Sequence, residues 1–92
     1  MLKIENTSQF KKDYRRAVKQ GRDMTRLREA LLLLASQSPL PESMCDHSLE
    51  GKYRGHRECH LEPDWLLIYK VDEGRLILIA TRFGSHSEIF KK

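Results

Sequence analysis

The sequence predicts an α+β fold, in which an N-terminal strand and a two-helix hairpin pack on a mainly antiparallel sheet of about four strands. Three observations predict this fold. Apolar residues recur at helical spacing in two segments before residue 36, three later segments have the composition of strands, and DEG separates the last two as a hairpin turn would. A chain of 92 residues has room for one such domain, which we expect to span residues 1–92.

Two periodicities define the first strand and the first helix. Leu2 and Ile4 alternate with charged residues, as in a short strand with one buried face. Thr7 or Ser8 can cap the helix that follows. In SQFKKDYRRAVKQG, lysine and arginine fill one helix face and apolar residues the other, and these apolar residues are Phe10, Tyr14, Ala17 and Val18. This segment is therefore predicted to be an amphipathic helix.

A second helix follows after a very short connection. Gly21 is placed to end the first helix in a left-handed conformation, and Asp23 can cap the next one. The second helix again carries a single apolar stripe, made of Met24, Leu27, Ala30, Leu31 and Leu34. Two helices joined so closely are expected to form an antiparallel hairpin.

The second half of the chain begins with a long predicted loop, residues 36–51. It contains Pro39 and Pro41 and has no apolar periodicity. Loops of this length in compact domains are commonly functional or disordered. Three predicted strands follow, at residues 53–61, 65–71 and 75–83.

Composition narrows the class of protein and of partner. Seventeen Lys and Arg against thirteen Asp and Glu give a net charge of +4, which favours a polyanionic partner such as nucleic acid but is also compatible with a plain solvated surface. The sequence has no signal peptide and no apolar run long enough to span a membrane, so we expect a cytoplasmic protein. Cys45 and Cys59 are expected to be reduced thiols.

The four histidines do not predict a metal site. His56 and His60 fall on one face of the predicted strand 53–61, but four residues of strand separate them by about 13–14 Å. Two ligands so far apart cannot share one ion, and no pair of cysteines at ligand spacing accompanies them. We therefore expect neither a metal nor another cofactor, and we expect His56 to be an ordinary strand residue.

A different set of residues predicts acid–base chemistry. His60 and Asp64 flank the turn between two strands, His86 follows the last strand, and His47 lies in the loop that enters the first of them. Antiparallel pairing would bring these chain ends together. Histidine supplies both protonation states near neutral pH, which cleavage of RNA through its 2′-hydroxyl requires. A fixed cation, Arg82 or Arg57, would balance the charge that builds on the phosphate.

At these residues the chain resembles the YafQ-type toxins of the RelE/ParE superfamily. Three blocks carry the resemblance, DHSLEG (46–51), RECHLEPDWLLIYK (57–70) and RFGSHSEIF (82–90), together with FKKD in the first helix. The resemblance covers nearly all of the chain. It implies a RelE-like fold and a toxin of a type II toxin–antitoxin system. Such a toxin is a ribosome-dependent mRNA endonuclease that inhibits translation and is inactivated by a cognate antitoxin.

The resemblance also implies roles for individual residues. The cleavage residues correspond to His47, His60, Asp64 and His86. Among the residues expected to contact RNA, Phe90 would touch the message, Arg82 would lie close to the phosphate, and Glu58 stands where the family often has an acid. Ser48 replaces the proline common after the first histidine, which leaves open how His47 is held.

Basic residues outside these blocks are candidates for docking on ribosomal RNA. Lys11, Lys12 and Arg15 lie on the polar side of the first helix, where they either bind phosphates or form a solvated face. Lys52, Arg54 and the C-terminal lysines offer an alternative docking surface. Two alternative functions remain at this stage: a ParE-like toxin directed at DNA gyrase, which would not need the histidine set, and a catalytically inert binding module.

Overall fold

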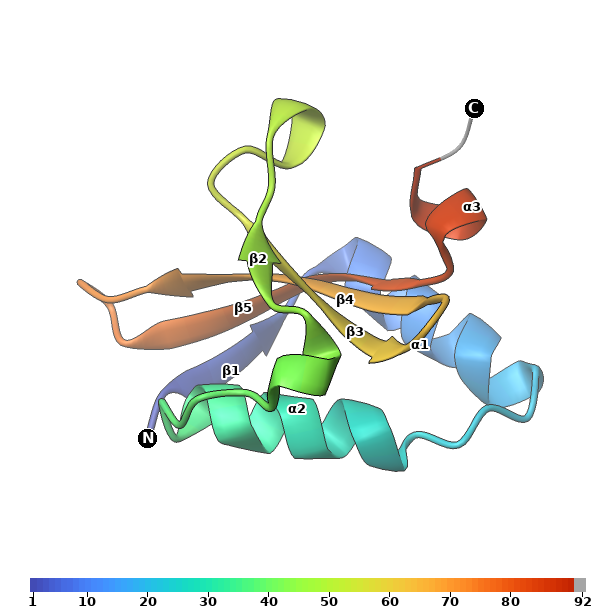
Figure 1. Ribbon diagram of the computed structural model, residues 1–92, viewed down its shortest axis with the longest axis horizontal. Coiled ribbons are helices and arrows are strands. Elements are labelled where there is room, and N and C mark those ends of the chain that lie inside the picture. The colour runs from blue at the N-terminus through green and yellow to red at the C-terminus, as the bar shows by residue number, and fades with distance from the viewer. Residues whose placement is uncertain (91–92) are drawn as a thin grey trace.

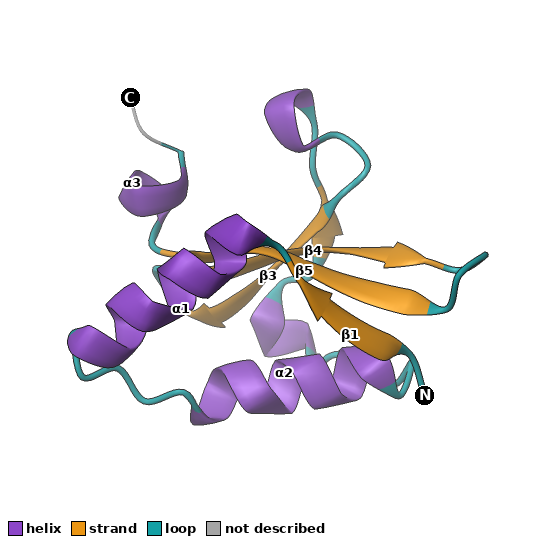
Figure 2. Cartoon of the chain, turned by 180° about the vertical axis from the view of Figure 1, so that it is seen from behind, coloured by secondary structure: helices purple, strands orange, loops and turns teal. Residues whose placement is uncertain are grey.

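The computed structural model describes residues 1–90, which form a five-stranded sheet that packs against two main helices (Figures 1 and 2). The strand order is β1-β5-β4-β3-β2. The strands are β1 (Lys3–Asn6), β2 (His47–Ser48), β3 (Arg57–Glu62), β4 (Trp65–Asp72) and β5 (Ile77–Gly84). The helices are α1 (Ser8–Lys19), α2 (Thr25–Ala35) and the short α3 (His86–Ile89), and η1 (Glu42–Met44) and η2 (Gly51–Tyr53) are single 3-10 turns.

The sheet is mainly antiparallel, as predicted, but it has one more strand than expected. β1 runs parallel to β5, whereas β5, β4, β3 and β2 pair antiparallel in turn. The additional strand is β2, which lies inside the segment predicted to be a loop. Its two residues pair with Arg57 and Glu58 of β3. A strand this short has no periodicity of its own, and only its partner defines it.

The strand boundaries also differ from the prediction in one place. β3 begins at Arg57 rather than at residue 53, because η2 and a turn occupy the preceding residues. Gly51 and Gly55 adopt positive φ angles of 69° and 89°, which an extended strand does not allow. His56 therefore lies before β3, and the prediction that it is a strand residue was wrong.

The helices form the predicted hairpin, splayed into a V (Figure 2). Gly21 between them has the expected left-handed φ of 74°. The Asp23 carboxylate accepts a hydrogen bond from the backbone N–H of Thr25 at 2.9 Å, but Met24 occupies the N-cap position that we had assigned to Asp23. Val18 is 53% exposed, so its predicted place on the buried face was also wrong. That face of α1 instead buries Asp13 beside Phe10 and Ala17.

Two apolar clusters hold the sheet, one on each of its faces. The larger cluster joins the helices to the sheet and includes Leu67, Tyr69 and Phe83. The smaller one, on the other face, consists of Tyr53, Leu66, Ile68 and Ile89. Because side chains alternate along a strand, β4 contributes to both clusters, which explains its almost uninterrupted run of apolar residues. The second face is the one that carries the histidines.

The two cysteines are unpaired, as expected. Cys45 is exposed, whereas Cys59 is buried in β3. Burial, together with the nearby Asp46 and Glu58 carboxylates, raises the pKa of the Cys59 thiol to about 12, so it remains protonated. Within residues 1–90, no helix combines the length and the apolar character needed to cross a membrane.

Candidate active site

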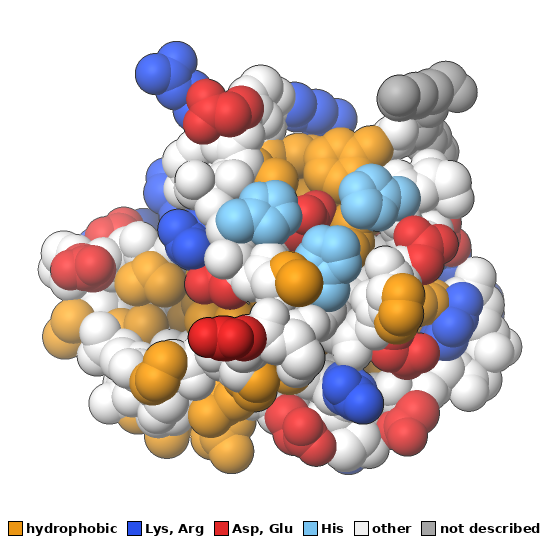
Figure 3. Space-filling model, in the orientation of Figure 1, with side chains coloured by type: hydrophobic (Ala, Val, Ile, Leu, Met, Phe, Trp, Pro, Cys, Tyr) orange, Lys and Arg blue, Asp and Glu red, His pale blue; other side chains and the backbone are white. Residues whose placement is uncertain are grey.

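Three histidines from three different elements gather on one face of the molecule (Figure 3). His47 comes from β2, His60 from β3 and His86 from the start of α3. The ring centroid of His60 is 6.3 Å from that of His47 and 6.4 Å from that of His86. His60 therefore lies between the other two, and the predicted convergence of these chain ends is observed.

A buried carboxylate connects two of these histidines. Glu58 is only 3% exposed, and its Oε2 lies 3.0 Å from Nε2 of His47 and 3.6 Å from Nε2 of His60. The arrangement follows from sheet geometry, since His47 is paired with Glu58 across the strands and His60 lies two residues further along β3 on the same face. Glu58 thus orients the histidine pair. Its sequence position had suggested an RNA contact, but the side chain is buried.

The third histidine is held by a different acid. His86 is the first residue of α3, and Ser85 and Glu88 form a reciprocal capping box around this helix start. The backbone N–H of His86 donates to Oδ1 of Asp64 at 3.2 Å, and the ring Nδ1 lies 3.8 Å from the same oxygen. Asp64, in the turn before β4, therefore fixes the position of His86.

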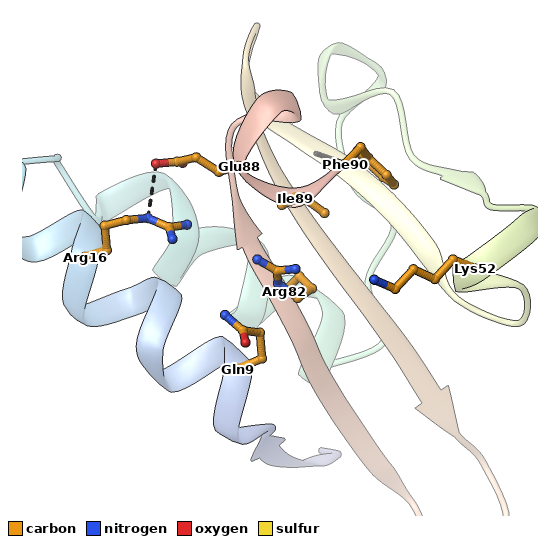
Figure 4. Close-up of a pocket in the computed structure, with 7 residues that line it drawn as sticks. All are labelled: Gln9, Arg16, Lys52, Arg82, Glu88, Ile89 and Phe90. Atoms are coloured by element: carbon orange, nitrogen blue, oxygen red, sulfur yellow. Dashed lines mark ion pairs between the residues drawn. The ribbon is translucent and has the colours of Figure 1, made fainter. Parts of the chain in front are cut away.

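A basic cavity of about 450 Å³ adjoins α3 and is lined by residues of α1, η2 and β5 as well (Figure 4). Arg82 from β5 and Lys52 from η2 point toward it, and Phe90 and Ile89 close one side. The ring centroid of Phe90, which lines the cavity, lies 5.6 Å from that of His86. Arg82, Lys52 and Phe90, three residues predicted to contact RNA, thus come together.

Other predicted contacts lie elsewhere. Arg57 follows the opposite alternation from Glu58, which places it on the helix side of the sheet. There it forms a bidentate ion pair with Asp46, at 3.2–3.3 Å. The structure therefore does not bring Arg57 to the histidines, and of our two candidates for the fixed cation only Arg82 lines the cavity with Phe90.

The remaining basic candidates are exposed and form no part of the histidine site. Lys11, Lys12 and Arg15 project from α1, where Lys11 and Arg15 border a separate groove between the two helices. Arg54 is exposed in the turn after η2. The C-terminal lysines, residues 91–92, lie outside the described residues.

The structure overturns our expectation that no metal ligands converge. One ligand atom from each of His47, Glu58 and His60 lies within 4.8 Å of the others. The sequence argument considered His56 and His60, whereas the observed set depends on the pairing of β2 with β3. Imidazole and carboxylate groups suit zinc or copper, although ligands of a tetrahedral zinc are only about 3.3–3.4 Å apart and the side chains would have to move inward. These residues therefore fit a transition metal with some adjustment.

Sequence reasoning missed the charged network behind Arg82. Its members are Asp13 and Arg16 of α1, with Tyr53 of η2. The one available signal was a carboxylate on the apolar side of an amphipathic helix, four residues after Gln9 and three before Arg16. That signal shows that Asp13 needs a partner but does not identify it.

Comparison with known proteins places the chain in a family. Residues 2–91 match the family described as "Bacterial toxin of type II toxin-antitoxin system, YafQ". The chain belongs to the YafQ toxin family. The mRNA interferase toxin YafQ of Escherichia coli K12 is 40% identical over 88 residues, which are 95% of this chain and 94% of that protein.

Solved structures of similar toxins agree with this assignment. A metal-bound toxin from Helicobacter pylori superposes with a TM-score of 0.92 at 42% identity, covering 98% of this chain and all of that one. The E. coli DinJ–YafQ complex contains a toxin chain with a TM-score of 0.87 at 38% identity, covering 98% and 99% of the two chains. The predicted RelE-like α+β fold and the predicted family are therefore confirmed, and the protein is a toxin of a type II toxin–antitoxin system.

Proposed function

We propose that this YafQ-family toxin inhibits translation by cleaving mRNA on the ribosome, through acid–base chemistry carried out by His47, His60, Asp64 and His86. Relatives that share 40% of its sequence over 95% of the chain are mRNA interferases, and the toxin is an endoribonuclease of the same kind. This relationship argues against the gyrase-directed alternative and against an inert binding module. The residue assignments rest on the geometry of the site.

The arrangement of His60 and His86 is the observation that carries the mechanism. Their ring centroids are 6.4 Å apart, so both imidazoles can reach atoms of one phosphodiester linkage. His60, oriented by Glu58, accepts the proton of the ribose 2′-hydroxyl. The 2′-oxygen attacks the adjacent phosphorus, the bond to the 5′-oxygen breaks, and His86 donates a proton to that oxygen. The products are a 2′,3′-cyclic phosphate and a free 5′-hydroxyl.

The other site residues support these two proton transfers. Asp64 holds His86, and His47 shares the Glu58 carboxylate with His60. Arg82 and Lys52 stabilise the negative charge that builds on the phosphoryl oxygens. Phe90, beside His86, offers an aromatic face on which a base of the message can stack. The site is open rather than a deep pocket, which suits a message presented by the ribosome.

The toxin acts in the cytoplasm and is neutralised by a cognate antitoxin encoded with it. The E. coli relative has been crystallised as a DinJ–YafQ toxin–antitoxin complex, and the resemblance over 98% of the chain supports a partner of the same kind here. Lys11, Lys12 and Arg15 are proposed to dock on ribosomal RNA through exposed, salt-sensitive contacts.

The reaction is proposed to need no metal. A related toxin from H. pylori is described as metal-bound, and His47, Glu58 and His60 would hold such an ion in this chain. A metal would supply Lewis-acid chemistry, but its positive charge beside the His60 ring would oppose the proton that His60 has to accept. We therefore propose that a transition metal in this cluster inhibits cleavage.

Cleavage in a reconstituted translation reaction tests the proposed function. Purified toxin is added to a reaction with a defined message, and message integrity is followed by primer extension. We expect new 5′ ends within the translated region when ribosomes are present and none when they are omitted. An intact message in the complete reaction, or equal cleavage without ribosomes, would contradict the proposal.

A further inference from the structure

Asp13 is a buried carboxylate that the mechanism above does not use. It is 1% exposed, and within the described part of the chain the buried charged residues are Asp13 and Glu58. Asp13 is the acidic residue of the FKKD stretch, which the resemblance to YafQ toxins includes without giving it a role. A carboxylate at such a position is costly unless its oxygens are paired.

Both oxygens of Asp13 are fully engaged. Oδ2 accepts from Nε of Arg82 at 2.8 Å and from the backbone N–H of Phe83 at 3.1 Å. Oδ1 accepts from Nη2 of Arg82 at 3.2 Å, from Gln9 at 3.1 Å and from Arg16 at 3.3 Å. Burial alone would raise the pKa of Asp13, but these hydrogen bonds, that of Arg82 first, outweigh it, so its pKa is lowered and it is ionised at neutral pH.

The bidentate contact fixes the plane of the Arg82 guanidinium. Nε and Nη2 face Asp13, and Nη1 lies 3.4 Å from the hydroxyl of Tyr53 on the other side. The side chain is 14% exposed, and it points into the cavity shared with Lys52 and Phe90 (Figure 4). An arginine has five N–H donors, so donors on Nη1 and Nη2 remain for a phosphate. Their direction is set by the groups behind them.

We propose that Asp13 is a positioning residue that acts through Arg82, holding the guanidinium so that its free donors meet the phosphate beside the scissile bond. The inference rests on the proposed RNA cleavage. An unrestrained arginine side chain has several flexible torsions. Ordering the side chain in advance removes the entropic cost of fixing these torsions from the transition state. Asp13 does not touch RNA in this scheme.

A purely structural role is the alternative. Asp13 also accepts the N–H of Phe83 at the edge of β5 that β1 leaves open, so it ties α1 to the sheet. If Asp13 were only a structural tie, its removal would lower the stability of the fold. It would then reduce cleavage by the same factor whether or not Arg82 is present. A positioning role predicts instead that the effect on cleavage disappears without Arg82.

A double-mutant cycle separates the two roles. Asp13→Asn, Arg82→Gln and the double variant are compared with wild type in single-turnover cleavage of ribosome-bound message at saturating toxin, with circular dichroism and thermal unfolding as checks of folding. We expect Asp13→Asn to slow cleavage about 10- to 100-fold, and to cause no further loss in the Arg82→Gln background. Asp72→Asn, which removes the carboxylate of a partly exposed aspartate–arginine pair at 3.9 Å, is the matched control and should cleave normally.

Tyr53→Phe provides a second variant, which leaves the ion pair between Arg82 and Asp13 in place. It removes the other contact of Arg82 and should slow cleavage less than Asp13→Asn, again only when Arg82 is present. Equal losses in both backgrounds, or wild-type cleavage by folded Asp13→Asn, would overturn the inference while leaving the proposed function intact. A wild-type toxin that does not cleave would instead refute the proposed function, and this inference with it.

Discussion

At the scale of single residues, the site is built from histidines with unequal surroundings. His60 is 25% exposed in its side chain and is flanked by both other rings, whereas His47 and His86 are 51% and 57% exposed. Glu58 orients the first two and Asp64 the third. A central, shielded histidine is suited to take a proton from a held ribose, and an exposed one is suited to release a proton to a departing strand.

The first prediction concerns His86. We expect His86→Ala to fold normally but to lose most message cleavage, because a methyl group cannot donate a proton to the leaving oxygen. Removal of a general acid typically costs 10²- to 10⁴-fold in rate. Primer extension on ribosome-bound message measures the loss, with thermal unfolding as the control. Near-wild-type cleavage by the folded variant would remove His86 from the mechanism.

A second prediction concerns metal at the same residues. Added zinc or copper should inhibit cleavage, and a chelator selective for transition metals, at a level that ribosomes tolerate, should restore it. Metal ligands must be deprotonated, so the inhibition should weaken as the solution is made more acidic. Activity that falls on chelation and returns with stoichiometric zinc would show that cleavage depends on the metal.

At the scale of elements, α1 has two faces with separate tasks. Its buried side carries Asp13, which contacts Arg82 at the cavity beside α3, and its exposed side carries Lys11, Lys12 and Arg15. These three cations form no ion pair with a carboxylate of the described residues. They are therefore available for phosphates.

The third prediction tests the exposed side of α1. Replacing Lys11, Lys12 and Arg15 together by glutamine should weaken ribosome association and make it less dependent on salt, because each phosphate contact releases counterions. Cleavage at saturating toxin should stay close to that of wild type. His60→Ala is the matched control, since it should bind ribosomes but fail to cut. Unchanged binding by the triple variant across a salt series would move the docking surface elsewhere.

The fourth prediction tests the buried side of α1 through pH. Because the pKa of Asp13 is lowered in the folded state from its ordinary 3.8, the ionised carboxylate stabilises the fold above that value. We expect Asp13→Asn to lower the free energy of unfolding by about 1–3 kcal/mol at neutral pH. The difference from wild type should shrink as the pH falls below 3.8 and Asp13 becomes protonated. Urea unfolding at several pH values measures it, and a difference that grows in acid would be the opposite result.

At the scale of the whole molecule, local patterns predicted the elements but not the contacts between them. β4 was predictable because a strand buried on both faces is a run of apolar residues. Both helices were predictable because each buries one stripe of residues, which recur at helical spacing in the sequence. β2 was not, because two residues become a strand only by pairing with β3. The same pairing places Glu58 between His47 and His60. Asp13 could not be assigned a partner, because Arg82 lies 69 residues away.

The same limit applies to the prediction of the candidate site. Three histidines and Asp64 were correctly expected to converge, because antiparallel strands return chain ends to one edge. Arg57 was misplaced, since one residue of strand alternation decides which face it occupies. The two faces of the sheet thus differ: one packs against the helices, and the other carries the histidines proposed to cleave RNA.

Cleavage of a message with a single 2′-deoxy nucleotide tests the central claim most directly. The substitution is placed on the 5′ side of a mapped cut, in a message stalled on purified ribosomes, and the products are compared with those of the all-ribose message. We predict that the cut disappears at the modified position and that the unmodified message yields a 2′,3′-cyclic phosphate and a 5′-hydroxyl. Undiminished cleavage at the 2′-deoxy position would contradict attack by the 2′-oxygen, and with it the acid–base roles of His60 and His86.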